Sequence, residues 1–351
     1  MTERGELGGR VVLGALALRP GGSGVQTYQR ELIRGLAGAD SPYRYAAVVQ
    51  SDTVGELPAG VEVVPRPVSS GTRRALVGLR SVGGASLFHG LDVDLPLAQR
   101  SPCVSTVHDM SVFDTPWAFS RVRARGERAL LTRSLRRADA VIAVSEFTAE
   151  RVRALTGREA TVVPLAPARW ATVPPDEAVS AVRDKYDLPP RFVLQLGTLE
   201  PRKRPDVVAA AARALDVPLV LGGAGTDGPG CPAGASGLGY VHQVDIPALY
   251  RAADVVAYAS VYEGFGLPPV EAMACGGVVA ASAVGGIPEA VGDGAVVVDD
   301  LSVEAWTSAL RRLLDDRDLR ARVRAEAAIR IHSRNWDAVA SETLAVYDAV
   351  G

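Results

Sequence analysis

Hydrophobic positions along the chain follow two different periods. Short runs rich in Val, Leu, Ile and Ala, typical of buried strands, are separated by longer segments with the 3.6-residue period of amphipathic helices. In the first half this pattern predicts strands at 11–18, 45–49, 61–64, 103–107 and 140–144. A second set is predicted at 192–196, 219–221, 255–258, 278–281 and 295–298. Such alternation is typical of doubly wound α/β domains with parallel sheets.

The spacing of helical patterns and prolines predicts where the domains meet. Helices are expected at 26–36 and 122–137, a charged helix at 301–331, and a final helix after Asn335-Trp336-Asp337. Prolines cluster at 163–167 and 174–175, which suits a linker between domains. We therefore expect an N-terminal Rossmann-like domain at 1–168, a second one at 169–335, and a separate last helix at 336–351.

Composition and charge narrow the class of protein. The 351 residues are 48% hydrophobic and 22% charged, as in a soluble globular protein large enough for two cores, which excludes disordered and fibrous chains. The formal charge is +6 over residues 1–175 and −8 over the remainder. With a pI near 6.2 we expect no nucleic-acid partner, whereas a phosphate or an anionic lipid suits the basic half.

Cysteine usage and the start of the chain indicate a cellular compartment. Cys103, Cys231 and Cys275 are odd in number and widely spaced, which suits neither a disulfide framework nor a metal site. The first apolar stretch, about eight residues long, is too short for a signal sequence or a membrane span. We expect a cytoplasmic protein.

The segment 260–276 contains the most informative combination of residue types. Prolines in the first turn and Gly276 after the last bracket a short helix, while Gly264 and Gly266 let the backbone approach a ligand. N–H groups at such a helix start can hold a diphosphate. Glu263 and Glu271 can point into one crevice and accept the hydroxyls of a sugar diol. Alternatively, Glu271 only favours the helix dipole and Glu263 is a solvated acid.

Two further segments follow predicted strands and contain basic side chains. In 197–205, Arg202 and Lys203 precede a helix, which suggests a phosphate clamp; a solvated basic turn is the alternative. His108 ends a strand and can hydrogen-bond a substrate or move a proton, unless it is a structural histidine. The same two interpretations apply, with a weaker signal, to His89.

The glycine loop 20–26, which includes Gly24, does not match the GxGxxG dinucleotide motif. It is expected to admit a sugar phosphate or an acceptor, or else to be a plain tight turn. The helix at 121–137 contains seven arginines, which suit an anionic lipid surface or a phosphorylated acceptor, or simply form a solvated helix face.

Taken together, these segments resemble the retaining glycosyltransferases of family 4, and the resemblance covers nearly the whole chain. It rests on the glycine loop at Gly24, His108-Asp109, 143–147, 200–203, 249–254 and the signature from Glu263 to Glu271. The resemblance implies the GT-B architecture, two facing Rossmann-like domains with a cleft between them. It also implies an N-terminal acceptor domain, a C-terminal donor domain and a last helix that crosses back to the first domain.

The resemblance also implies a nucleotide-sugar donor site and a role for each residue. The expected roles are Lys203 and Arg202 on the diphosphate, Glu271 on the ribose, Glu263 on the transferred sugar, backbone at Gly264, Phe265, Gly266 and Leu267 completing the site, His108 on the donor sugar, and Gly24 near the phosphates or acceptor. No metal and no other cofactor is expected. The sequence departs from the family pattern at three places, and these departures concern which donor is bound: Arg204, Thr198 and Gly277-Val278.

The expected reaction is transfer of a hexosyl group with retention of configuration. GDP-mannose is the first donor predicted, ahead of UDP- and dTDP-sugars. The acceptor is a glycan, a lipid-linked glycan or a secondary metabolite, with weak peripheral contact at the inner membrane surface. A sugar-nucleotide epimerase and a non-catalytic nucleotide-sugar-binding subunit are the alternatives. A pyridoxal-phosphate phosphorylase is disfavoured, because neither Lys185 nor Lys203 suits a Schiff base.

Overall fold

A computed structural model describes residues 9–20, 24–92 and 95–351 of the chain. Contacts divide it into two compact units, Met1–Leu165 with Trp336–Gly351, and Ala166–Asn335. The division lies close to the boundary expected at 168, and the last helix belongs to the first unit. We call them unit 1 and unit 2.

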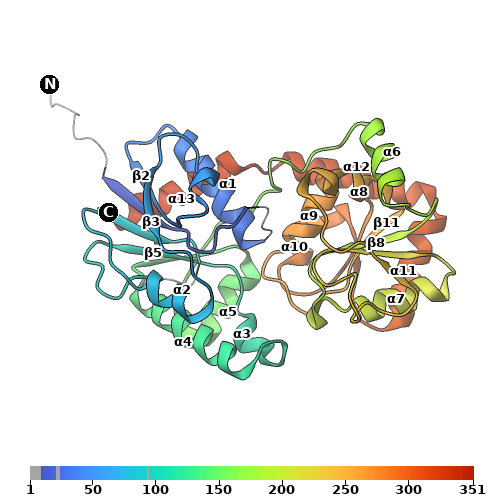
Figure 1. Cartoon of the computed structure of the whole chain (residues 1–351), viewed down its shortest axis with the longest axis horizontal. Coiled ribbons are helices and arrows are strands. Elements are labelled where there is room, and N and C mark those ends of the chain that lie inside the picture. Colours follow the sequence, from blue (N-terminus) through green and yellow to red (C-terminus); the bar gives the residue numbers. More distant parts are fainter. Residues whose placement is uncertain (1–8, 21–23, 93–94) are drawn as a thin grey trace. The chain divides into compact units, whose positions relative to one another are not determined.

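Unit 1 is built on a seven-stranded parallel sheet with the order β3-β2-β1-β4-β5-β6-β7 (Figure 1). Its strands are β1 (Arg10–Gly14), β2 (Arg44–Gln50), β3 (Glu62–Arg66), β4 (Leu87–Gly90), β5 (Cys103–Val107), β6 (Ala140–Ala143) and β7 (Thr161–Val162). The central strands β4 and β5 are buried along their whole length, as expected of a parallel sheet covered on both faces.

Helices connect these strands. They are α1 (Val25–Gly38), α2 (Gly71–Gly78), α3 (Ser111–Asp114), α4 (Arg121–Arg137), α5 (Glu146–Thr156) and the last helix α13 (Trp336–Val350), with short 3-10 turns η1 (Val54–Glu56) and η2 (Pro116–Ala118). Helix α13 packs on α1, where a side chain at Gly35 would come within 2.9 Å of the Trp336 carbonyl. The close approach buries Trp336 and joins the end of the chain to unit 1.

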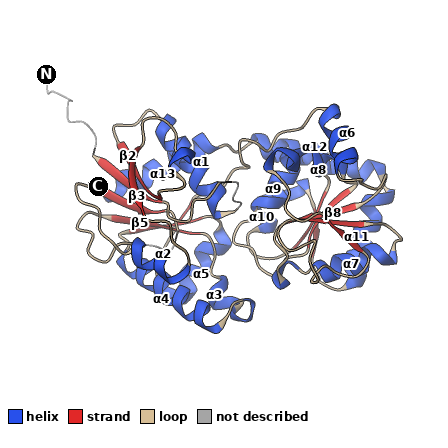
Figure 2. Ribbon diagram, viewed as in Figure 1, coloured by secondary structure: helices blue, strands red, loops and turns tan. Residues whose placement is uncertain are grey.

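Unit 2 repeats the arrangement with a six-stranded parallel sheet in the order β10-β9-β8-β11-β12-β13. Figure 2 shows these strands surrounded by helices. The strands are β8 (Val193–Leu196), β9 (Leu219–Gly222), β10 (Ala235–Gly237), β11 (Val255–Tyr258), β12 (Val279–Ser282) and β13 (Val296–Val298). The helices are α6 (Asp176–Lys185), α7 (Pro205–Ala214), α8 (Ile246–Ala252), α9 (Leu267–Ala274), α10 (Ile287–Val291), α11 (Val303–Asp315) and α12 (Arg317–His332), with 3-10 turns η3 (Pro201–Lys203), η4 (Gln243–Asp245) and η5 (Gly292–Gly294). Trp306 of α11 is fully buried in the core that α7 and α11 form with the sheet.

The predicted fold class, two doubly wound parallel sheets, is confirmed, two local predictions are wrong, and three short strands are additional to those predicted. The strand expected at 11–18 ends at Gly14. The single helix expected at 301–331 is two helices, because Asp316 is extended and its carboxylate caps the N–H of Leu319. Strands β4, β7 and β10 were not predicted; β7 and β10 are very short, and β4 reads Leu-Phe-His-Gly, without a β-branched residue.

Candidate active site

The loop between β11 and α9 is shaped by close backbone contacts. A side chain at Gly285 would lie 1.8 Å from the Glu263 carbonyl, so only glycine lets the two segments touch. The N–H of Gly286 donates to that carbonyl at 3.0 Å. Gly266, at φ +101, caps α9 in the left-handed conformation that glycine favours. The backbone beside Glu263 is therefore fixed by the fold.

Helix α9 begins with few donors for an anion. Pro268 and Pro269 have no N–H, and the N–H of Val270 already donates to the Gly266 carbonyl. Within the first turn of α9, only the N–H of Leu267 is left by this count to face a phosphate. The start of α9 thus offers fewer N–H donors to a phosphate than the sequence pattern suggests. The positive charge of the site comes mainly from the nearby cations.

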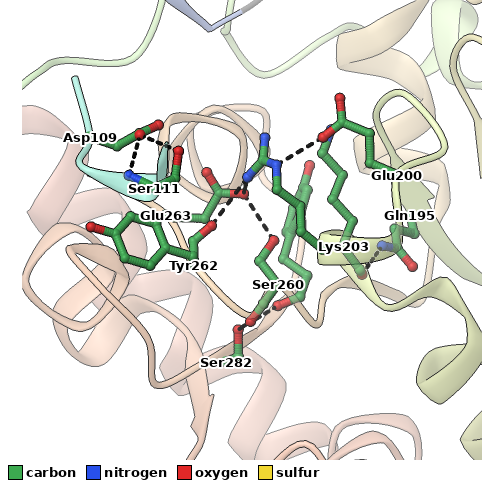
Figure 3. A network of polar contacts seen from close by, with 11 residues as sticks. Asp109, Ser111, Gln195, Glu200, Lys203, Ser260, Tyr262, Glu263 and Ser282 are labelled. Carbon is green, nitrogen blue, oxygen red and sulfur yellow. Dashed lines mark hydrogen bonds and ion pairs between the residues drawn. The ribbon is translucent and has the colours of Figure 1, made fainter. Parts of the chain in front are cut away.

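Glu263 is held through one of its two carboxylate oxygens. The Oε1 atom accepts from the hydroxyl of Ser260 at 2.9 Å and from Nη1 of Arg202 at 3.1 Å (Figure 3). Ser260 is itself fixed, because its carbonyl accepts from the Ser282 hydroxyl at 2.6 Å. The Glu263 side chain is 21% exposed. Its carboxylate is therefore oriented and still reachable from solvent.

Arg202 connects the β8 and β11 loops. Its Nε donates to Oε2 of Glu200 at 2.8 Å, and its Nη1 also donates to the Tyr262 carbonyl at 3.1 Å (Figure 3). In return, the Arg202 carbonyl accepts from the N–H of Val261 at 2.8 Å. Arg202 was expected on a diphosphate; in the structure its guanidinium contacts two carboxylates.

Lys203 lies in the same turn with a different environment. Its carbonyl accepts from the side-chain amide of Gln195 at 2.9 Å (Figure 3), and a side chain at Gly197 would lie 2.5 Å from its Nζ. Burial lowers the pKa of Lys203, and the charge of Glu263 opposes that shift. Within the described part of the chain, no carboxylate lies at ion-pair distance from Nζ. Lys203 thus brings a cation whose charge is not neutralised by direct contact.

A small cavity adjoins Lys203 at the carboxyl ends of β8 and β9. Its lining includes Gln195, Gly197, Thr198 and Thr226. Gln195 is 6% exposed, and its Oε1 has no hydrogen-bond partner among the described residues. The one polar residue in the buried strand Val-Leu-Gln-Leu is the feature of the sequence that distinguishes this position from its neighbours.

Glu271 lies inside α9, where it is only 6% exposed. Burial, and then the nearby Glu271 carboxylate, raise the pKa of the Cys275 thiol well above its usual range. Glu271 is therefore buried within unit 2.

His108 lies at the carboxyl end of β5 in unit 1. Its Nε2 is 2.9 Å from the Leu91 carbonyl, which can only accept, so Nε2 holds the proton. The edge of the Tyr28 ring packs on the imidazole, with centroids 4.6 Å apart and planes at 79°. Among described residues, Nδ1 has no hydrogen-bond partner. His108 is thus positioned with Nδ1 available to a ligand.

Two other predicted positions in unit 1 have different surroundings. Gly24 caps α1 at φ +61, and no described atom lies within 4 Å of where a side chain would start, while residues 21–23 of that loop lie outside the described residues. His89 is fully buried between the hydroxyls of Tyr347 and Thr106, at 2.6 and 2.8 Å. Burial lowers the pKa of His89 to about 3, as expected of a structural, neutral histidine.

The arginine-rich helix α4 is divided between structural and exposed side chains. Arg128, Arg133 and Arg137 donate to main-chain carbonyls of α3 and of the loop between β4 and β5, so they stabilise unit 1. At the other end of the helix Val122 is 80% exposed, and Trp117 of η2 is 61% exposed.

No group of three or more His, Cys, Asp or Glu side chains within the described residues is arranged to hold a metal ion. Within the same residues, no helix is long and apolar enough to span a bilayer.

Comparison with known proteins places the chain in a family. Residues 181–330 match the model of the glycosyl transferases group 1, and residues 22–166 match that of Glycosyltransferase Family 4. The O-antigen chain mannosyltransferase B of Escherichia coli is 31% identical over 282 residues, which is 74% of either chain. The D-inositol 3-phosphate glycosyltransferase of Salinispora tropica is 40% identical over 51% of this chain and only 43% of its own length.

Solved structures share the fold at low identity. The sucrose-phosphate synthase of Thermosynechococcus elongatus matches with a TM-score of 0.76 and 20% identity, covering 97% of this chain and 98% of its own. HepE of Anabaena, solved with UDP-glucose, matches with a TM-score of 0.74 and 19% identity over 97% of this chain and 99% of its own. With the two Rossmann-like sheets and the matched sequence signatures, the chain belongs to the family 4, group 1 glycosyltransferases and is a transferase enzyme.

Proposed function

We propose that unit 2 binds a nucleoside-diphosphate sugar and that the enzyme transfers its hexosyl group with retention of configuration. The observation that supports this most is the pairing of an un-neutralised Lys203 with an oriented, accessible Glu263 at the carboxyl edge of one parallel sheet. Ligands of open α/β sheets bind at that edge. A diphosphate needs a cation, and a sugar needs an acceptor for its hydroxyls.

The proposed role of each residue follows from the charge of its side chain. Lys203 would contact the diphosphate and stabilise the charge that develops on it as the glycosidic bond breaks. The N–H of Leu267 would add one donor, with backbone at Gly264, Phe265 and Gly266 lining the sugar site. Glu263 would accept from a hydroxyl of the transferred sugar and Glu271 from the ribose. His108 would contact the donor sugar through Nδ1, and Gly24 would leave room for phosphate or acceptor.

The proposed mechanism is front-face transfer with no enzyme nucleophile and no required metal ion. Glu263 is 21% exposed, and its Oε1 is held by Arg202 and Ser260, an arrangement that suits hydrogen bonding to a sugar hydroxyl. Preorganised donors such as Lys203 supply the charge stabilisation. Trapping of a glycosyl group on Glu263, detected by mass spectrometry of the intact enzyme, would contradict this mechanism.

The donor and acceptor are proposed from the relatives. GDP-mannose is our first donor, because a mannosyltransferase is among the similar proteins at matched length. UDP-glucose is the second, since HepE was solved with it. The acceptor is proposed to be a lipid-linked or other glycan. Trp117 and Val122 beside the arginines of α4 support weak contact with an anionic membrane surface, which co-sedimentation with anionic and neutral vesicles would test.

The test of this function is a direct assay of product. Purified enzyme is incubated with GDP-mannose or UDP-glucose and a panel of glycan and lipid-linked acceptors. We expect acceptor-dependent release of nucleoside diphosphate and an α-linked product from these α-configured donors, assigned by the anomeric coupling in NMR. Interconversion of the nucleotide sugar without an acceptor would instead indicate an epimerase. Binding of the donor with no turnover of any acceptor in the panel, together with loss of that binding in Lys203→Ala, would favour an accessory subunit.

A further inference from the structure

The two cations of the turn 201–203 differ in what they contact. Arg202 contacts the carboxylates of Glu200 and Glu263, at 2.8 and 3.1 Å. Lys203, the next residue, has no carboxylate at ion-pair distance within the described part of the chain. A guanidinium next to two carboxylates has its charge largely neutralised, so it attracts a diphosphate less than a lone ammonium does.

Both the guanidinium and the carbonyl of Arg202 contact the segment that presents Glu263. Its Nη1 donates both to Oε1 of Glu263 and to the carbonyl of Tyr262, the preceding residue. The Arg202 carbonyl accepts from the N–H of Val261. One arginine therefore fixes the main chain of 261–262 and the side chain of Glu263 together. Its planar fork suits this task, since lysine has a single flexible ammonium group.

Glu263 is left with one oxygen for a ligand. Oε1 accepts from Arg202 and from Ser260, whereas Oε2 has no partner among the described residues. A carboxylate held in this way has a fixed plane and one free oxygen. Catalytic groups gain most from such fixed geometry, because misplacement by about 1 Å costs roughly 10²-fold in rate.

We propose that Arg202 is a positioning residue that orients Glu263, so that Oε2 faces the transferred sugar, while Lys203 alone of the two cations binds the diphosphate. The inference rests on the proposed function of the same site. Glu200 shares the role, because it orients the guanidinium from the other side. Arg202 then affects the rate of transfer through Glu263 and affects nucleotide affinity little.

The experiment compares Arg202→Ala, Arg202→Lys and Lys203→Ala in two measurements. Calorimetry with GDP and UDP reports diphosphate binding, and steady-state kinetics with the sugar nucleotides report transfer. For Arg202→Ala we expect nucleoside-diphosphate affinity within about 2-fold of wild type and kcat about 30- to 100-fold lower, since geometry at Glu263 is lost. Arg202→Lys should recover part of kcat. Lys203→Ala should weaken nucleoside-diphosphate binding instead.

The matched control is Arg191→Ala. Arg191 also contacts one carboxylate, of Asp315, and one main-chain carbonyl, of Leu314, both at 2.9 Å in unit 2. It makes no contact with Glu263 in the hydrogen bonds and ion pairs described. Its loss should leave kcat and nucleotide affinity unchanged, which separates the specific effect of Arg202 from the general cost of removing a bound arginine.

A double-mutant cycle tests the coupling between Arg202 and Glu263. Glu263→Gln in the wild-type background should lower kcat, and in the Arg202→Ala background it should lower kcat much less, since residues that act as a unit are not additive. Ser260→Ala, which removes the other donor to Oε1, should lower kcat by a smaller factor and also leave nucleotide affinity unchanged. That variant tests the same idea if Arg202→Ala does not fold.

Two results would overturn the inference. One is a loss of nucleoside-diphosphate affinity in Arg202→Ala as large as in Lys203→Ala, which would place Arg202 on the phosphates. The other is full additivity of Arg202→Ala and Glu263→Gln. Failure of the proposed function is distinguishable, because wild-type enzyme would then bind none of the nucleotides.

Discussion

Units 1 and 2 have the same sheet plan but very different chemistry at the carboxyl ends of their strands. In both, the first strand of the unit pairs with the second and the fourth, and all strands are parallel. In unit 2 the groups at this edge are charged: Lys203, and the pair of Arg202 with Glu263. In unit 1, His108 is held between the Leu91 carbonyl and the edge of the Tyr28 ring, and the Asp109 carboxylate beside it accepts from the N–H and hydroxyl of Ser111.

These side chains suit the two units to different parts of one reaction. A diphosphate carries negative charge and needs a cation with little neutralisation by the protein, which unit 2 has in Lys203. A sugar hydroxyl needs an oriented hydrogen-bond partner, which unit 1 offers in Nδ1 of His108. One fold repeated within a chain can thus acquire two binding roles by changing only a few side chains at the strand ends.

The largest expected effect lies in unit 2, at Glu263. Glu263→Ala should lower kcat by roughly 10²–10³-fold, about 3–4 kcal/mol, because an oriented group facing the reacting sugar is lost. Nucleoside-diphosphate affinity should stay near wild type in calorimetry. Glu304→Ala, the same change at an exposed position of α11, should have no effect on kcat. A kcat for Glu263→Ala within a factor of two of wild type would contradict the account.

The next effect concerns the buried polar network of unit 1. Because burial lowers the pKa of His89 from 6.5 to about 3, the folded state binds fewer protons than the unfolded state between these values. Stability should therefore fall as the pH drops below 6.5, by up to about 1.4 kcal/mol per pH unit. Urea unfolding at pH 7, 6 and 5 measures this slope.

His89→Gln provides the comparison for that slope. The variant should be less stable at pH 7 and lose less stability on acidification than wild type. His242→Gln, at an exposed position, should keep the wild-type slope. An unchanged slope in His89→Gln would show that another group accounts for the acid sensitivity.

A substitution of His108 tests whether unit 1 affects the rate of transfer without binding the nucleotide. His108→Ala should lower kcat about tenfold, roughly the 1.4 kcal/mol of one hydrogen bond in the transition state, and leave nucleoside-diphosphate affinity unchanged. The control is His332→Ala, an exposed histidine in the last turn of α12. Loss of GDP or UDP affinity in His108→Ala would mean that unit 1 shares the nucleotide site.

The smallest effect is expected at the last helix. Tyr347→Phe removes the hydroxyl that bonds Nδ1 of His89 at 2.6 Å, so the free energy of unfolding should fall by about 1 kcal/mol. Urea unfolding at pH 7 measures the change. Tyr240→Phe, at a residue that is 60% exposed, should leave stability unchanged. Equal stability of both variants would show that the His89 contact does not hold α13.

The sequence predicted the repeated α/β plan well, because buried parallel strands are nearly continuous apolar runs. The strand at 103–107 and the strand at 255–258 have the predicted bounds. The short edge strands β7 and β10 have too few residues to show a period. The break at Asp316 depends on a single N-cap within an otherwise helical pattern, which periodicity does not detect.

The residues of the candidate site could be predicted from the sequence, but the contacts between their side chains could not. Glu263, Arg202 and Lys203 stand out as acids and bases after strands. The turn η3 decides which of the two cations contacts Glu263. Its geometry directs the Arg202 side chain toward Tyr262 and Glu263. Tyr28 gave no sequence signal, because its contact with His108 joins residues 80 positions apart in the chain.

The central claim is that unit 2 binds a nucleoside diphosphate through Lys203. Isothermal titration of GDP, UDP, dTDP and ADP into wild type and Lys203→Ala tests it most directly. We predict that at least one nucleotide binds wild type and that Lys203→Ala binds it at least about tenfold more weakly, since a charge-assisted contact of roughly 1.5–3 kcal/mol is lost. Equal affinity of the two proteins, or no binding of any nucleotide to wild type, would contradict the account.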